Sequence, residues 1–274
     1  MIRLGNISLI FDAGTPDEKE ALKNINLTIK PGDFITIIGS NGAGKTTLFN
    51  AAAGTRSISS GRIFISEKTV SGAADTIERE ITREPEYKRA RYIGRIFQNP
   101  MLGTAGRMSL EDNMVVCSQK GYRGLKISLN RKLREQFRAE LATLGMGLEN
   151  RLGDNVELFS GGQRQALTLL MTVMSHPSLL LLDEHTAALD PRNAELVMEL
   201  TQRFAWEYKL TVMMITHNMG HAIEMGNRLL MMDEGEIIMD IDAAEKAKLT
   251  TGGLVQRFRD IKNKELANDE MLLG

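Results

Sequence analysis

The sequence predicts an α/β fold with a mostly parallel sheet, and three observations carry this prediction. Consecutive apolar residues at 179–182 and 212–215 are typical of strands buried on both faces, as the strands of a parallel sheet are. A further apolar run at 34–38 leads through a glycine-rich loop into a helix-forming run at 48–53. The strand expected at 61–65 has an alternating pattern, which indicates an additional antiparallel sheet.

The glycine-rich loop carries a phosphate-binding pattern. It matches G-x-x-x-x-G-K-[ST] in full, with the residues Gly39, Ser40, Asn41, Gly42, Ala43, Gly44, Lys45, Thr46 and Thr47. Glycines place no β-carbons in the way, so backbone N–H groups and the positive end of the following helix can surround phosphate oxygens. We expect Lys45 to reach the β- and γ-phosphates of ATP, and Thr46 to offer its hydroxyl to Mg²⁺. A glycine-rich turn without a ligand is the alternative, but the strand before the loop and the helix after it favour a P-loop.

A second anion-binding helix start is predicted farther along the chain. Ser160 is a good N-cap, Gly161 and Gly162 permit close backbone approach, and a helix from Gln163 must end before Pro177. This helix start lacks a lysine or a Mg²⁺-binding arrangement of its own. We therefore expect it to complete the nucleotide site of another chain. A capped helix that follows a glycine turn is the alternative.

Two adjacent carboxylates, Asp183 and Glu184, end the apolar run at 179–182. Their burial without a cation would be costly, and ligands in open α/β sheets collect at the carboxyl ends of strands. We expect Asp183 to bind Mg²⁺, and Glu184 to orient or deprotonate the water that attacks the γ-phosphate.

With these three motifs in order, the chain resembles the ATP-binding cassette (ABC) ATPases, whose signature is Leu-Ser-Gly-Gly-Gln. In this chain Phe159 is inserted between the leucine of the signature, Leu158, and its Ser-Gly-Gly-Gln core, which is intact. The resemblance implies the same roles for Asp183 and Glu184. It also implies a head-to-tail homodimer, in which each ATP lies between the P-loop of one chain and the residues from Ser160 to Gln163 of the other.

The resemblance assigns roles to three more residues. His217, which follows the run at 212–215, matches the switch histidine that contacts the γ-phosphate. Gln98 matches the Q-loop glutamine, which bridges Mg²⁺ or the attacking water to the membrane partner. Phe11, at the end of an expected strand, matches the aromatic ring that stacks on adenine. Taken alone, His217 is open to interpretation as a structural residue and Phe11 as a core residue, and a single glutamine is weak evidence.

Three features depart from the family pattern. His185 and Ala187 stand where the family usually has Pro and Ser. We expect His185 to face solvent, although it could add a titratable group near the γ-phosphate. Ala187 removes a hydroxyl from the loop that crosses the dimer interface. The charged segment 67–91 is expected to be a solvated extension without chemistry of its own.

Composition excludes several function classes. The 274 residues can form one large domain. Lys and Arg number 34 against 35 for Asp and Glu, so the formal charge of -1 offers no basic footprint for nucleic acid. The one cysteine, Cys117, excludes an internal disulfide and is expected to be a buried small apolar residue. No apolar run approaches the ~18 residues that a spanning helix needs, and residues 1–6 do not begin a signal peptide.

The resemblance implies one ABC ATPase domain over residues 1–274. Residues 1–97 and 163–240 would form the P-loop (RecA-like) core with its antiparallel β subdomain, residues 98–162 an inserted α-helical subdomain, and residues 241–274 a C-terminal tail. Helical spacing of apolar residues predicts an amphipathic helix in the insertion and a short docked helix in the tail. These residues are Leu133, Phe137, Leu141 and Leu144 in the insertion, and Leu254, Phe258 and Ile261 in the tail.

The resemblance leaves three functions open. The first is the ATP-hydrolysing subunit of an importer, which the single cassette favours. This subunit would bind a membrane permease at the cytoplasmic face of the membrane and work with a substrate-binding protein. The second is an exporter or a lipid-extracting system, and the third is a soluble cassette ATPase in translation or DNA repair. Residues 97–105 are similar to bacterial uptake systems that use a substrate-binding lipoprotein, with aromatic amino acids as one suggested cargo. The sequence does not name the cargo, because the permease and the binding protein select it.

Overall fold

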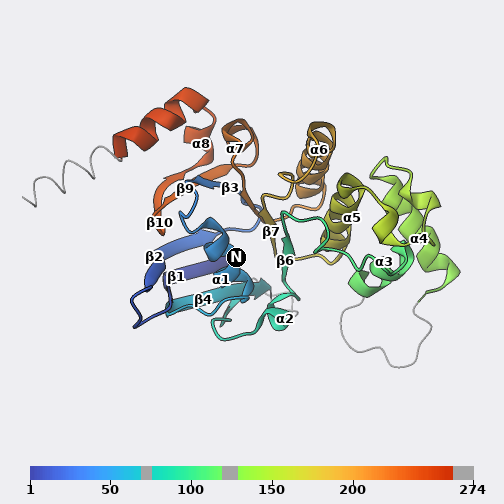
Figure 1. Ribbon diagram of the computed structural model, residues 1–274, viewed down its shortest axis with the longest axis horizontal. Coiled ribbons are helices and arrows are strands. Elements are labelled where there is room, and N and C mark those ends of the chain that lie inside the picture. Colours follow the sequence, from blue (N-terminus) through green and yellow to red (C-terminus); the bar gives the residue numbers. More distant parts are fainter. Residues whose placement is uncertain (69–75, 119–128, 262–274) are drawn as a thin grey trace, which may run out of the picture.

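The computed structural model describes residues 1–68, 76–118 and 129–261, and it confirms the predicted α/β class (Figure 1). Its central feature is a six-stranded sheet in which the strands from β9 to β6 run parallel and β10 pairs antiparallel with β9. In spatial order the strands are β10 (Glu236–Ile241), β9 (Arg228–Asp233), β3 (Phe34–Gly39), β8 (Val212–Ile215), β7 (Leu179–Asp183) and β6 (Ile93–Ile96). Every residue of β7 and β8 is buried, as their apolar runs predict.

A second, antiparallel sheet packs on the first through the P-loop helix α1 (Lys45–Ala53). Its strands, in spatial order, are β2 (Lys19–Ile29), β1 (Ile2–Phe11), β4 (Ser60–Lys68) and β5 (Thr76–Glu80). Buried side chains of α1, such as Leu48 and Phe49, join both sheets in one apolar cluster. The helix that follows the P-loop is therefore held between two layers.

Part of the charged segment 67–91 is folded. Most of its described side chains are exposed, as expected, but the expected solvated extension is wrong for Ile81 and Arg89, which are buried. Strand β5 extends the antiparallel sheet, and α2 (Glu86–Arg89) follows it. Arg89 is only 2% exposed, and it donates hydrogen bonds of 2.8 Å to the carbonyl oxygens of Ala51 and Ala52. A cation at these last carbonyls of α1 is favourable, because the end of a helix is partially negative. Residues 69–75 lie outside the described residues.

The helical insertion lies on the far side of β6, at the right of Figure 1, and its buried side chains join an apolar cluster that also includes α5, α6 and residues of the central sheet. Its elements are α3 (Leu110–Ser118), α4 (Arg131–Ala142) and the 3-10 turns Leu148–Asn150 and Val156–Leu158. The predicted apolar face of α4 is confirmed, because Phe137 and Leu141 are fully buried. Leu144 is also buried, although it lies just past the end of the helix.

Three further helices and the tail complete the fold. The helices are α5 (Gly161–Met174), α6 (Pro191–Glu207) and α7 (Met219–Glu224). The tail contains α8 (Ala243–Lys246) and a helix at 251–261, at the upper left of Figure 1. Leu254 is fully buried and Phe258 packs beside it, in agreement with the predicted docked helix. Within the described ranges, no helix is both long and apolar enough to cross a membrane.

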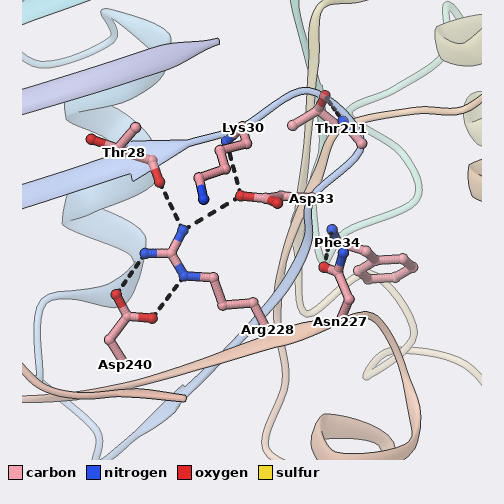
Figure 2. Close-up of polar contacts among 9 residues, drawn as sticks. Thr28, Lys30, Asp33, Phe34, Thr211, Asn227, Arg228 and Asp240 are labelled. Atoms are coloured by element: carbon pink, nitrogen blue, oxygen red, sulfur yellow. Dashed lines mark hydrogen bonds and ion pairs between the residues drawn. The ribbon is translucent and has the colours of Figure 1, made fainter. Parts of the chain in front are cut away.

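A polar network fixes the amino end of β3, opposite the P-loop (Figure 2). The Arg228 guanidinium donates to the Thr28 carbonyl oxygen and to the Asp240 carboxylate, both at 2.7 Å, and pairs with Asp33 at 3.4 Å. The Phe34 N–H donates to the side-chain oxygen of Asn227 at 2.9 Å. Strands from both sheets are thereby joined where β3 begins, so β3 presents the P-loop from a rigid base.

Candidate active site

The P-loop turn depends on glycine at defined positions. Gly42 and Gly44 have φ angles of 86° and 95°, in the left-handed region that glycine adopts without a steric penalty. A β-carbon on Gly39 would lie 2.1 Å from the Met232 carbonyl oxygen, so no larger residue fits beside β9. The loop therefore passes directly from β3 into α1 with its backbone close to the site.

Lys45 is held inside this loop. It is 5% exposed, and its ammonium group donates to the carbonyl oxygens of Gly39 and Ser40 at 2.8 and 2.9 Å. Burial lowers the pKa of Lys45, and the nearby carboxylates of Glu184 and Asp183 oppose that change. The ammonium group is therefore placed where phosphates held by the loop would meet a positive charge.

A cavity of about 290 Å³ lies over the P-loop. Phe11 lines it from the end of β1, and Glu184 lines it from the end of β7. The residues from Asn41 to Thr47 also line this cavity. The structure thus brings Phe11, Glu184 and the P-loop to one space, as the predicted nucleotide site requires.

A second cavity, of about 440 Å³, lies beside Thr46 and Asp183. Gln98 and Glu184 line it as well, so the expected metal-binding and water-orienting groups face the same space. The Thr46 hydroxyl donates to Asp183 Oδ1 at 3.3 Å. Hydroxyl and carboxylate oxygens fit Mg²⁺, which prefers hard oxygen ligands together with substrate phosphates over an all-protein cage. Accordingly, the described residues contain no cluster of three or more His, Cys, Asp or Glu that could hold a metal by itself.

Arg95 is a site residue that the sequence analysis missed. Its guanidinium pairs with Asp183 at 2.9 Å, and its side chain also lines the second cavity. The available signal was an arginine inside the short apolar strand β6, a position where a charge needs a partner.

Glu184 turns away from its neighbour Asp183 and meets His217. Its φ of 49° lies in the left-handed region, which is uncommon for a residue other than glycine. Its Oε1 lies 2.6 Å from His217 Nε2, and it is largely shielded, with 17% of its side chain exposed. The two residues predicted to act at the γ-phosphate are therefore in direct contact.

The expectation that His185 faces solvent is wrong. His185 is 1% exposed, and its Nε2 lies 3.0 Å from the Thr201 hydroxyl. Burial, followed by the nearby His221, lowers the pKa of His185 to about 4, so the ring is neutral at pH 7. Its carbonyl oxygen accepts a 2.6 Å hydrogen bond from Gln165 Nε2, which ties the residue after Glu184 to α5. Ala187 takes part in the same turn through its N–H, which donates to the Glu184 carbonyl oxygen at 2.9 Å.

The signature residues form a capped helix start, but they line neither of these two cavities. The Ser160 hydroxyl accepts from the Gln163 N–H at 3.2 Å, and Gln163 Oε1 accepts from the Ser160 N–H at 3.1 Å. Ser160 and Gly161 are exposed. A β-carbon on Gly162 would lie 2.5 Å from Asn193, so this glycine allows α5 and α6 to pack closely. The structure therefore does not place the signature beside Lys45 of the same chain.

Comparisons with known proteins agree with this geometry. A family model described as ABC transporter matches residues 22–187. The chain is 37% identical to a tyrosine transport ATP-binding protein of Clostridioides difficile, over 94% of this chain and 98% of that protein. It is 32% identical to a phosphonates import ATP-binding protein of Lactobacillus johnsonii, over 90% of this chain and 92% of that protein.

The fold is similar to that of a solved ATP-binding cassette, a dimer in a post-hydrolysis state bound to ADP and phosphate. The TM-score is 0.69 at 26% identity, over 89% of this chain and 99% of that chain. The segment that matches the family model, residues 22–187, begins in β2, spans the P-loop and the signature, and ends just after the Asp183–Glu184 pair. The chain therefore belongs to the ABC transporter family, as one of its cassette ATPases.

Proposed function

We propose that this chain is the ATP-hydrolysing subunit of an importer for a small solute. The contact between Glu184 and His217 carries the catalytic part of this proposal. The distance from Glu184 Oε1 to His217 Nε2 is 2.6 Å, and Glu184 lines the same cavity as Lys45 and the P-loop. The near full-length similarity to proteins named for tyrosine transport and phosphonate import supports the transport part.

In the proposed reaction, the P-loop amides and Lys45 hold the phosphates of ATP, and Phe11 stacks on the adenine. The Glu184 carboxylate accepts a proton from a water molecule as that water attacks the γ-phosphorus, and the bond from phosphorus to the oxygen bridging to ADP breaks. The contact of His217 Nε2 with Glu184 Oε1 keeps the Glu184 carboxylate in place. Mg²⁺ held by Thr46 and Asp183, with Gln98 at the same cavity, would neutralise charge on the phosphate oxygens.

We propose that two copies of the chain close head to tail around two ATP molecules. The exposure of Ser160 and Gly161 supports this arrangement, since this end of α5 in one copy is accessible to the phosphates held by its partner. The start of a helix, with the positive end of its dipole and here a serine hydroxyl, is suited to bind the γ-phosphate. The dimeric state of the solved cassette supports the same arrangement.

The importer would also contain a membrane permease and a substrate-binding protein, with this chain bound at the cytoplasmic face of the membrane. Met101 and Leu102, which follow Gln98, are 57% and 64% exposed, and such apolar side chains next to the site suit a docked permease. We propose an aromatic amino acid as the cargo, because the 37% identical relative is named for tyrosine transport.

The test is purification of the complex from membranes, followed by its reconstitution in liposomes. With this chain and ATP inside the liposomes and tyrosine and the binding protein outside, we expect tyrosine to accumulate inside. Tyrosine loaded inside the same liposomes should not be expelled. A complex that hydrolyses ATP but accumulates no aromatic amino acid would refute the cargo. A chain that co-purifies with no membrane subunit would refute the importer.

A further inference from the structure

Arg95 is fixed from several sides beside the proposed magnesium site. One terminal nitrogen donates to Asn50 Oδ1 of α1 at 2.7 Å, and the other pairs with Asp183 Oδ2 of β7 at 2.9 Å. Its guanidinium carbon lies 4.6 Å from the centre of the Phe97 ring, which adds a cation–π contact. Its side chain is 9% exposed, so these contacts hold the guanidinium in one place. Arg95 therefore links α1, β7 and the residue before Gln98.

The position of Arg95 has an electrostatic consequence for the cation that Asp183 is proposed to bind. Thr46 occupies one carboxylate oxygen of Asp183 and Arg95 occupies the other. A divalent cation at Thr46 and Asp183 must share that carboxylate with a guanidinium that cannot lose its proton. The two positive charges repel each other, and little water is available to screen them in a largely buried pair.

We propose that Arg95 is a built-in counter-charge that holds Asp183 in place and makes divalent-cation binding depend on nucleotide. Without phosphates, the guanidinium satisfies Asp183 and repels the cation. When phosphates occupy the P-loop, their negative charge exceeds the positive charge of Arg95. The cation then binds together with the nucleotide. Arg95 is thus a positioning residue, because it acts through Asp183. This inference rests on the proposed Mg²⁺–ATP site. It adds that the site binds the divalent cation together with the nucleotide in preference to the cation alone.

The test measures binding of Mn²⁺, a paramagnetic substitute for Mg²⁺, to the full chain by electron paramagnetic resonance, with and without ADP. We expect Arg95→Gln, which removes the charge and keeps a donor, to tighten Mn²⁺ binding without nucleotide by roughly tenfold, as Coulomb repulsion over a few ångströms predicts. Arg95→Lys keeps the charge and is the matched control, and its Mn²⁺ affinity should stay close to that of the parent. Structural damage would weaken binding, so a gain in affinity reports the lost charge.

A second variant covers the case in which Arg95→Gln does not fold. Asn50→Asp supplies Arg95 with a second carboxylate and so offsets its charge while the arginine remains, and it should also tighten Mn²⁺ binding. If these variants bind Mn²⁺ no more tightly than the parent and Arg95→Lys, the proposal is wrong. The parent itself tests the underlying site, because the absence of ADP-dependent Mn²⁺ binding would overturn the proposed magnesium site and not only the role of Arg95.

Discussion

Replacement of Glu184 by glutamine tests the proposed hydrolysis most directly. Glutamine has nearly the same shape, and its side-chain oxygen can still accept the contact that Glu184 makes with His217 at 2.6 Å. The substitution therefore removes the proton acceptor without opening a cavity or displacing Lys45. A general base contributes about 10² to 10⁴ in rate, which corresponds to roughly 3 to 5 kcal/mol of the activation barrier. We expect turnover to fall by that factor, while ATP affinity changes by no more than a few-fold.

The measurement is single-turnover ATP hydrolysis together with equilibrium binding of ATP, and size-exclusion chromatography in ATP should show a trapped dimer. Glu207→Gln is the matched control, because this substitution makes the same chemical change at the exposed end of α6. Both variants should unfold at the same temperature as the parent. If Glu184→Gln hydrolyses ATP as fast as Glu207→Gln, Glu184 is not the base and the proposed mechanism fails.

Three further predictions concern binding, the dimer and pH. Phe11→Ala should weaken ATP and GTP alike by roughly 1 to 3 kcal/mol, because every base can stack on an aromatic ring; unchanged affinities in calorimetry would return Phe11 to the core. Ser160→Arg mixed with Lys45→Ala should regain part of the ATPase activity that each variant lacks alone, whereas a site complete within one chain predicts no gain. The pKa of His185 is about 4 in the folded chain and about 6.5 when unfolded, so protonation favours unfolding and stability falls as pH decreases from about 6.5 towards 4. Urea titrations should find this loss, by up to about 3 kcal/mol, and His185→Gln should reduce it; an equal loss in both proteins would contradict the assignment.

The parts of the site that lie together in the sequence could be predicted from it. The P-loop is one continuous turn, so its glycines, Lys45 and Thr46 reveal their arrangement through their spacing. The apolar runs of β7 and β8 are typical of strands buried on both faces, and a candidate catalytic residue, Glu184 or His217, follows the end of each strand within two residues. In these segments local geometry is dictated by neighbouring residues, and the structure agrees with the predicted strands.

The parts that depend on contacts between distant segments could not be predicted. A histidine after two carboxylates resembles a surface residue until Thr201 is known to lie 3.0 Å from its ring. Arg89 belongs to a stretch dense in charge, and nothing within that stretch indicates that it caps α1. Arg95 needs both Asn50 and Asp183, which are 45 and 88 residues away. Buried charges are stabilised by partners, and sequence patterns identify the charge more readily than the partner.

The adjacent carboxylates illustrate how the backbone assigns different chemistry to neighbours of the same type. Asp183 is the last residue of β7, and its side chain lies among Thr46 and Arg95. At Glu184 the chain leaves the strand with a φ of 49°, which directs the second carboxylate to His217. A residue held in this conformation costs free energy, so the surrounding contacts must maintain it. The hydrogen bond from the Glu184 N–H to the Ile215 carbonyl oxygen, at 3.2 Å, is one of them. A single turn at the end of β7 thus separates a carboxylate suited to a cation from one suited to a water molecule, and both line the cavity that Gln98 shares.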